Sequence, residues 1–269
     1  MAPMRGMAIL AALILALGGP RAAADVEVDV ELVLAVDVSR SMTMNEREIQ
    51  RRGYAEALVS APVLQAIRSG MLGRVAIAYV EWAGADSQRV VVDWTLIRDA
   101  ADAAAFARRL SADPGMAMRR TSISGAIDFA ARMFDGNGFS GLRRVIDISG
   151  DGPNNQGRPV TGARDDAVAA GLVINGLPLM TREGAGLQWQ LDDLDGYYRD
   201  CVIGGPGAFV IPVRDWGEFA AAVRRKLVLE IAGIAPPAPA RLVPAADAPR
   251  DCLVGERIWE RMRREWMQP

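Results

Sequence analysis

Residues 28–36 read VDVELVLAV and residues 37–41 read DVSRS. The first stretch has the length and apolar character of a strand, and the second is a polar loop that follows it directly. Ligands of an open parallel sheet bind beyond the carboxyl ends of its strands, which is where Asp37 is expected. Alternate spacing lets Asp37, Ser39 and Ser41 face one point. A carboxylate and two hydroxyls predict a hard oxygen site that suits Mg²⁺ or Mn²⁺.

Strand-length apolar runs alternate with helical patterns along the chain. Strands are expected at residues 28–36, 74–81, 89–94, 143–148, 172–177 and 208–213, and helices at residues 45–60, 99–110, 124–134, 161–170 and 216–230. This alternation predicts an α/β fold with a Rossmann-like, doubly wound and mostly parallel sheet. The link at residues 82–88 is as short as a hairpin, so we expect the third strand to be an antiparallel edge.

The chain divides into four predicted segments. They are a signal peptide at residues 1–24, the α/β domain at 25–231, a Pro- and Ala-rich linker at 232–251 and a C-terminal helix at 252–269. The leader combines the basic Arg5, an apolar run at residues 7–17 and small residues at 22–24, the pattern of a cleaved export signal. A membrane anchor or a buried helix is the alternative. We expect an exported protein, periplasmic or secreted, whose mature chain has no transmembrane segment.

Two cysteines, Cys201 and Cys252, are the only ones in the chain. Because an exported protein meets an oxidising environment, we expect them to form a disulfide, with two unpaired thiols as the alternative. The bond would tether the C-terminal helix, whose apolar residues Ile258, Trp259 and Met262 recur at helical spacing. That helix either docks back on the domain or binds a partner.

Composition excludes several classes of function. The chain has no His, which removes Ser-His-Asp and Cys-His nucleophile systems, HExxH zinc sites and His-ligated haem. With 31 Lys and Arg against 33 Asp and Glu, it lacks the basic excess of a nucleic-acid binder. Any metal must be held by oxygen or sulfur ligands.

Two further segments could complete the oxygen site. Asp151 follows the strand expected at 143–148, so it also lies at a carboxyl end, and the glycines on either side of it let the backbone turn sharply. Thr121 precedes a helix and offers a third hydroxyl, although Ser122 and Ser124 are close enough to take its place. The alternative for these polar residues is that they cap helix N-termini without a metal.

These three motifs, in this order, resemble the metal-ion-dependent adhesion site of the von Willebrand factor type A superfamily. The DVSRS loop, Thr121 with Gly125 four residues later, and the pair Asp151-Gly152 match its elements. The resemblance implies Mg²⁺ or Mn²⁺ held by Asp37, Ser39, Ser41, Thr121 and Asp151. Gly150 departs from the many adhesion-type sites that have Thr or Ser there. More narrowly, DISGDGPNN (147–155) and CVIGGPG (201–207) resemble the domain-of-unknown-function 1194 family of secreted bacterial proteins.

The resemblance implies a non-enzymatic module that binds an acidic side chain of an unknown protein partner through its metal. Loop residues Arg40, Asn154 and Asn155, with Met42, Met44 and Gln156, are expected on the rim of the site, and Arg40 is a candidate to pair with the partner carboxylate. Two alternatives are a scaffold that does not use the metal and an Mg²⁺-dependent hydrolase. The sequence has no phosphate-binding loop of the P-loop type and no general base beyond the ligands, which disfavours the hydrolase.

Overall fold

A computed structural model of the protein describes residues 24–113, 115–181, 191–234, 236 and 250–266. Its centre is a five-stranded sheet in the order β4-β3-β2-β6-β7. The strands are β2 (Glu31–Asp37), β3 (Val75–Trp82), β4 (Gln88–Ile97), β6 (Arg144–Gly150) and β7 (Val173–Pro178). All neighbours are parallel except β3 and β4, so β4 is an antiparallel edge. The predicted α/β fold and its antiparallel edge are therefore confirmed.

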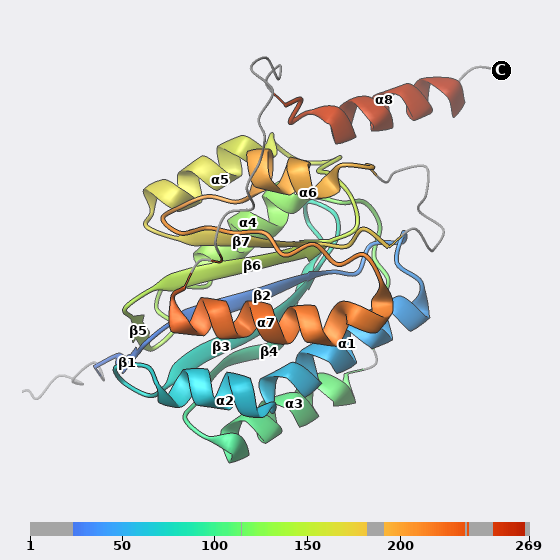
Figure 1. The fold of residues 1–269 in the computed structure, drawn as a ribbon. Helices are drawn as coiled ribbons and strands as arrows, with labels where there is room; N and C mark the ends of the chain where they lie inside the picture. The colour runs from blue at the N-terminus through green and yellow to red at the C-terminus, as the bar shows by residue number, and fades with distance from the viewer. Residues whose placement is uncertain (1–23, 114, 182–190, 235, 237–249, 267–269) are drawn as a thin grey trace, which may run out of the picture.

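Helices cover both faces of the sheet, as Figure 1 shows. One layer contains α1 (Met44–Leu58), α2 (Ala61–Arg68), α3 (Ala100–Ala112) and α7 (Phe219–Ala232). The other contains α4 (Ile123–Arg132), α5 (Val160–Ala169), α6 (Leu194–Tyr197) and the π-turn that continues α6 (Tyr198–Val202). The central strand β2 is buried along its whole length, between two hydrophobic cores. Leu32 and Leu34 belong to the first core, under α1, α2, α3 and α7, and Val33 and Ala35 belong to the second, under α4, α5 and α6. A strand covered on both faces needs a continuous apolar run, which is what residues 32–36 provide.

Two of the predicted strands differ in the structure. The first is divided into β2 and a short β1 (Val26–Val28), which pairs with β5 (Phe139–Gly141). The division falls at Asp29, whose carboxylate accepts the backbone N–H groups of Leu72 and Arg74 at 2.9 and 3.2 Å. The strand predicted at residues 208–213 is wrong, since this segment forms only isolated bridges beside β7. Ile211 and Val213 donate to Gly176 O and Pro178 O at 3.0 and 2.9 Å, but Pro178 has no N–H to donate in return, so the ladder is interrupted there.

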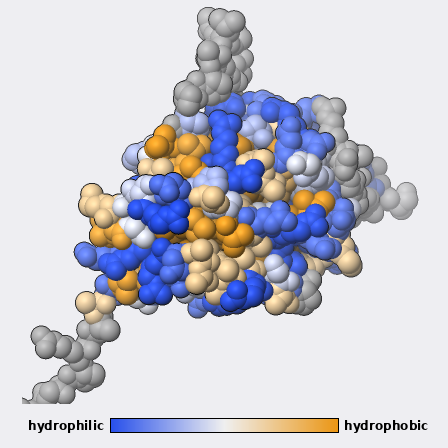
Figure 2. Space-filling view, turned by 60° about the horizontal axis from the view of Figure 1, so that its bottom comes forward, coloured by the Kyte–Doolittle hydropathy of each residue, from blue (hydrophilic) through white to orange (hydrophobic). Residues whose placement is uncertain are grey.

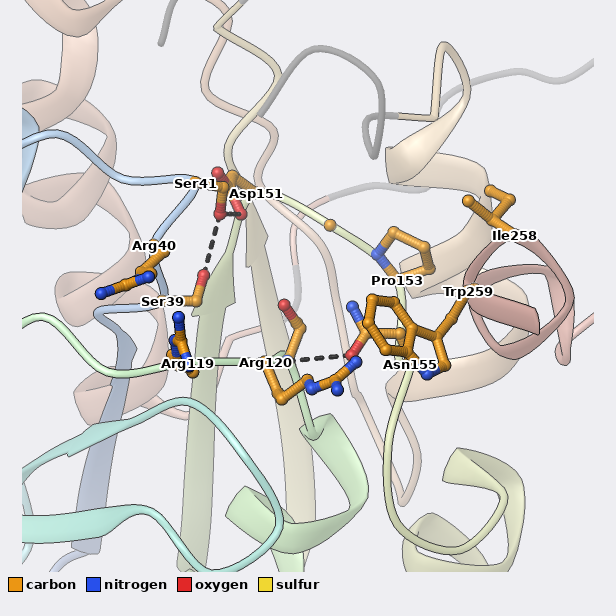
Figure 3. A pocket seen from close by; sticks show the side chains of 13 residues that line it. Ser39, Arg40, Ser41, Arg119, Arg120, Asp151, Pro153, Asn155, Ile258 and Trp259 are labelled. Carbon is orange, nitrogen blue, oxygen red and sulfur yellow. Dashed lines mark hydrogen bonds between the residues drawn. The ribbon is translucent and has the colours of Figure 1, made fainter. Parts of the chain in front are cut away.

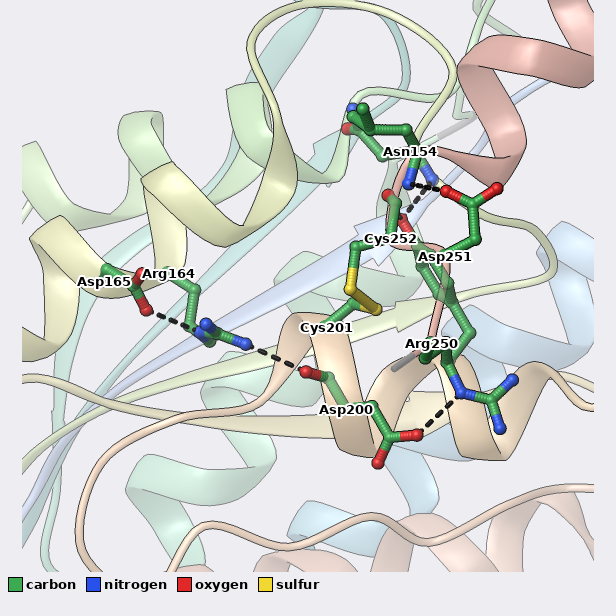
Figure 4. The surroundings of a disulfide bond; sticks show 10 residues. Asn154, Arg164, Asp165, Asp200, Cys201, Arg250, Asp251 and Cys252 are labelled. Carbon is green, nitrogen blue, oxygen red and sulfur yellow. Dashed lines mark hydrogen bonds and ion pairs between the residues drawn. A yellow bond between two sulfur atoms is a disulfide. The ribbon is translucent and has the colours of Figure 1, made fainter. Parts of the chain in front are cut away.

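The C-terminal helix α8 (Val254–Trp266) extends beyond the body of the domain (Figure 1). The predicted disulfide between Cys201 and Cys252 is present, and it fixes the start of α8 to the π-turn (Figure 4). Arg250 strengthens the attachment through an ion pair of 2.7 Å with Asp200. The predicted leader and linker fall almost entirely outside the described residues, so these segment boundaries stay predictions. No helix in the described ranges is long and apolar enough to cross a membrane.

Candidate metal centre

The DVSRS loop folds back over the end of β2. Its first turn is closed by the backbone N–H of Ser39, which donates to Asp37 Oδ1 at 2.7 Å. The two serine hydroxyl oxygens are 2.8 Å apart, and the Ser41 hydroxyl donates to Asp151 Oδ1 at 2.9 Å. Figure 3 shows Ser39, Ser41 and Asp151 meeting in this way. The ends of β2 and β6, which are neighbours in the sheet, therefore bring both predicted motifs to one point.

Backbone contacts hold this loop in place. The N–H of Val38 donates to Trp82 O, and the N–H of Met118 donates to Val38 O, at 2.9 and 3.1 Å. The amide of Gln50, on α1, donates to Asp37 O at 3.1 Å. The loop is therefore tied to β3, to the segment before Thr121 and to the helix that follows it, so its serines are presented on a fixed backbone.

Of the three hydroxyl residues in the second motif, only Thr121 lines the cavity at this edge. Ser122 caps α4 by accepting the N–H of Gly125 at 3.1 Å, and Ser124 is fully buried. Asn155 clamps the Thr121 backbone, because its side chain accepts the Thr121 N–H at 3.0 Å and its own N–H donates to Thr121 O at 2.9 Å. The geometry thus favours Thr121 over the two serines as a site residue.

The expected rim residues fall into two groups. Arg40 is exposed and lines the cavity, together with the half-buried Asn155 (Figure 3). Asn154 does not face the rim, because it is fully buried and its side chain joins Ser124 N at 3.0 Å to Glu256 Oε1 at 2.7 Å. Met42 is also buried and packs in the first core. The rim positions predicted for Asn154 and Met42 are therefore wrong, because both loops turn these side chains towards the protein interior.

Met44 and Gln156 are the other two residues expected on the rim, and both are exposed. Neither lines the cavity. The Gln156 side chain accepts the N–H of Ala85, at the β3–β4 hairpin, at 3.1 Å.

The two carboxylates of the site are buried close together. Asp37 is fully buried, and its Oδ2 has no hydrogen-bond partner among the described residues. Burial, followed by the negative charge of Asp151, raises the pKa of Asp37 well above its usual range. Burial raises the pKa of Asp151 to about 6, although the hydrogen bond from Ser41 opposes the shift. The site thus concentrates negative charge that a divalent cation would offset.

The donor set fits a hard divalent ion. Hydroxyl and carboxylate oxygens are the ligands that Mg²⁺ and Mn²⁺ prefer, and an unpartnered carboxylate oxygen is available at Asp37. The described residues contain no group of three or more acidic or cysteine side chains placed to hold a metal. A site here therefore depends on its hydroxyls as well as on its two carboxylates.

The cavity beside these residues has a volume of about 390 Å³ and includes residues that the sequence analysis did not connect with the site. Arg119 and Arg120 line it from the Thr121 loop, and Gly255, Ile258 and Trp259 line it from α8. The guanidinium carbon of Arg120 lies 3.4 Å from the centroid of the Trp259 ring. The arginines follow no local motif, and α8 reaches the site only through the tertiary fold.

Gly150 is explained by a residue that the sequence analysis left unassigned. A Cβ atom at position 150 would lie 2.9 Å from the Tyr198 hydroxyl and 3.0 Å from Asp37 Oδ2. The Tyr198 hydroxyl is itself buried without a hydrogen-bond partner in the described chain. Only glycine leaves room for a phenol beside the Asp37 carboxylate, so Tyr198 takes the space that a Thr or Ser side chain would occupy.

Comparison with solved structures shows the same fold in proteins of distant sequence. Proximal thread matrix protein 1 from the mussel byssus, solved with a zinc-occupied MIDAS motif, has a TM-score of 0.52 and 14% identity, over 78% of this chain and 49% of that one. A von Willebrand factor type A protein from Catenulispora acidiphila has a TM-score of 0.52 and 16% identity, over 76% and 43%. The pilus adhesin SpaC from Lactobacillus rhamnosus GG has a TM-score of 0.53 and 12% identity, over 77% and 32%.

The match therefore spans about half of the mussel protein and a smaller share of the other two proteins. At these sequence identities it shows the fold alone. No curated protein matches the sequence. One family model does match, over residues 27–235, which include all the candidate metal ligands. The chain therefore belongs to the family described as Protein of unknown function (DUF1194), whose domain here has the von Willebrand factor type A fold.

Proposed function

We propose that this protein is an exported, non-enzymatic binding module that recognises an acidic side chain of a protein partner through Mg²⁺ or Mn²⁺. The ion would be held by Asp37, Ser39, Ser41, Thr121 and Asp151. Bound there, it would act as an electrophile with water-filled positions that a partner carboxylate can enter. The zinc-occupied motif of the mussel protein supports a divalent ion on this fold.

One observation carries the proposal, namely the unpartnered Oδ2 of a fully buried Asp37 beside two convergent serine hydroxyls. A buried polar atom without a partner costs ~1–3 kcal/mol, and Asp37 Oδ2 differs from the other such atoms of the described residues in being a carboxylate oxygen at the carboxyl edge of the sheet with a second carboxylate, Asp151, beside it. A cation above the loop would give this oxygen a partner and would offset the negative charges of Asp37 and Asp151. The serine hydroxyls, free to rotate, can turn their lone pairs towards it.

Binding rather than turnover is favoured by the cavity lining. Among the described residues that line it, Asp151 is the only acidic one, and the proposal uses Asp151 as a ligand. No other described lining residue can act as a general base near neutral pH, because the remaining ionisable ones are arginines. Export is supported by the predicted leader and by the disulfide, a bond typical of oxidising compartments.

The proposal is tested by thermal unfolding of the purified chain in EDTA and in Mg²⁺, Mn²⁺, Ca²⁺ or Zn²⁺. A ligand that binds only the folded state adds ~2.7 kcal/mol at a hundredfold excess over Kd, which shifts Tm by about 5–10 °C for a domain of this size. Asp151→Asn should lose the shift, whereas the matched control Asp135→Asn, at an exposed position where α4 ends, should keep it. Equal shifts in both variants would contradict the proposed site, and no shift in any metal would favour the scaffold alternative.

A further inference from the structure

We propose that the cavity beside the metal centre contains a second anion subsite, formed by Arg119 and Arg120 and walled by Trp259, and that the partner is an acidic peptide segment with two carboxylates. One carboxylate faces the ion and the other pairs with the arginines. This inference rests on the proposed function and specifies the chemistry of its partner. It also assigns a role to α8, which supplies part of the binding surface.

The first support is a cluster of uncompensated positive charge. Arg40, Arg119 and Arg120 line the cavity, and Arg263 of α8 lies close enough to act on Arg120 electrostatically. None of these four side chains forms an ion pair with an acidic residue in the described ranges, whereas Arg51, Arg89, Arg158 and Arg164 do. Like charges gathered without a counter-ion are suited to an anionic ligand.

The second support is the way in which Arg120 is held. It is the only described non-glycine residue with a positive φ, at 75°, a backbone region that side chains rarely adopt. Strained residues of this kind persist where the surrounding structure fixes them, and they concentrate at binding sites. Its guanidinium stacks on Trp259 at 3.4 Å, as Figure 3 shows, which leaves the edge of the guanidinium free to donate hydrogen bonds.

The third support is the anchoring of α8, which makes Trp259 a fixed wall. The disulfide at Cys252 holds one end, and Glu256 accepts a hydrogen bond from Asn154, in the Asp151 loop, at 2.7 Å. Gly255 packs so closely that a Cβ there would lie 2.1 Å from Asn154 O. The first two turns of α8 are therefore tied to the same loop that carries Asp151.

The lining chemistry favours a peptide as the source of the two carboxylates. Pro153, Ile258 and the Trp259 ring make an apolar floor on the side of the cavity next to α8 (Figure 3). Aliphatic carbons of a peptide can cover that floor while its two acidic groups reach the polar ends. A small inorganic anion would occupy one end and leave the apolar floor wet.

The test uses an array of short peptides with one aspartate at a fixed position and a second aspartate at each other position in turn. Peptides with a single aspartate and with none serve as references. The chain, purified after export from cells that express the full sequence, is applied in Mg²⁺ and in EDTA. It is compared with the double variant Arg119→Ser, Arg120→Ser. The matched control is Arg224→Ser, Arg225→Ser, two adjacent exposed arginines on α7. Circular dichroism and thermal unfolding confirm that each variant is folded.

We expect at least one spacing to bind about tenfold tighter than the single-aspartate peptide in Mg²⁺, the gain of one charge-assisted pair. The Arg119, Arg120 variant should lose that preference and keep single-aspartate binding, and the control should keep both. Trp259→Ala should weaken the preference and Trp259→Phe should retain most of it, because the ring positions Arg120. Metal-dependent binding with no second-aspartate preference overturns this inference alone. No metal-dependent binding of any peptide overturns the proposed function as well.

Discussion

Replacing Lys226 by Met tests how much a buried ion-pair cluster contributes to the stability of this domain. Lys226 is the only lysine in the chain, and it is fully buried between α7 and β6. Its Nζ lies 2.8 Å from Asp147 Oδ1 and also contacts the carboxylate of Glu230, one turn further along α7. Asn175 donates to the same Glu230 carboxylate at 2.9 Å. The substitution removes the one cation that two buried carboxylates share.

The expected cost follows from the burial of all three groups. Breaking a buried ion pair by removing one partner costs ~3–5 kcal/mol, since the remaining charge is left without compensation. Met fills most of the space of the lysine stem, so the cavity contribution is small. A domain has a total stability of ~5–15 kcal/mol, so the loss is large enough to measure without ambiguity.

The loss should depend on pH. Burial, followed by the charge of Glu230, raises the pKa of Asp147 to about 7, against 3.8 for an ordinary aspartate. The folded state thus keeps a proton that the unfolded chain releases, so this group makes the free energy of unfolding fall as the pH rises from about 4 to about 7. Lys226 opposes this rise of the Asp147 pKa, so without the lysine the free energy of unfolding continues to fall to higher pH. The cost of Lys226→Met should therefore be smaller at pH 5 than at pH 8, where it should reach ~3–5 kcal/mol.

Urea unfolding of wild type and variant at both pH values measures this difference, with Arg225→Met as the matched control on the exposed side of the same helix. A triple variant that also carries Asp147→Asn and Glu230→Gln should recover most of the stability, because no buried charge then remains. A loss below about 1 kcal/mol at pH 8, or equal losses at the two pH values, would refute the reasoning.

Three further predictions concern the site and its tether. Reducing the disulfide, or changing Cys201 and Cys252 to Ser, should lower the free energy of unfolding by up to ~4 kcal/mol, the value of the chain-entropy model for a separation of 51 residues. Urea unfolding with and without reductant measures this loss, and no change would mean that α8 is held without the bond. Gly150→Ala should lower the free energy of unfolding by ~1–3 kcal/mol through overpacking. Adding Tyr198→Phe, which removes the hydroxyl oxygen nearest to the new methyl group, should restore part of that stability in the same assay. No effect of Gly150→Ala would contradict the close packing. Ser41→Ala should weaken Mn²⁺ binding in calorimetry about tenfold or more while the metal-free Tm changes little, and unchanged affinity would exclude this hydroxyl as a ligand.

The central part of the fold could be predicted because its signals are local. A continuous apolar run, followed by DVSRS, locates both the buried strand β2 and the polar loop at its carboxyl end. The division at Asp29 could not be predicted in this way, since it depends on N–H groups of Leu72 and Arg74. The segment at 208–213 likewise has the pattern of a strand, yet it forms only isolated bridges, because Pro178 of β7 has no N–H to continue the ladder.

The cavity is harder to predict because it is assembled from distant segments. Arg120 and Trp259 belong to no common motif, and they meet only because the disulfide and the Asn154–Glu256 hydrogen bond bring α8 to the Asp151 loop. Asn154 shows the converse error. A polar residue next to a candidate ligand suggests a rim position, but its side chain is used entirely inside the protein.

The face of the domain in Figure 2, by contrast, indicates no binding partner. On the face that Figure 2 shows, hydrophilic side chains lie among smaller groups of hydrophobic ones. Scattered apolar residues of this kind are ordinary for a folded protein and point to no partner. The functional argument therefore depends on the carboxyl edge of the sheet.

A comparison within one segment of the chain supports a ligand at that edge. Asp29, Glu31 and Asp37 are all buried acids on or beside β2. At the amino end of the strand each carboxylate is satisfied at both oxygens: backbone N–H groups serve Asp29, and Asn137 and Gly141 donate to Glu31 at 2.6 and 2.7 Å. At the carboxyl end Asp37 has one satisfied oxygen and one without a partner in the described chain.

Burial alone cannot explain this difference, because the three side chains are buried to nearly the same degree. The same fold that supplies every donor at one end omits one at the other, where Asp151 adds a second negative charge and a cavity opens between Ser41 and Trp259. An unsatisfied buried oxygen of this kind is explained by an external ligand or a bound water that completes the site. The asymmetry along β2 is thus what the proposed metal site predicts.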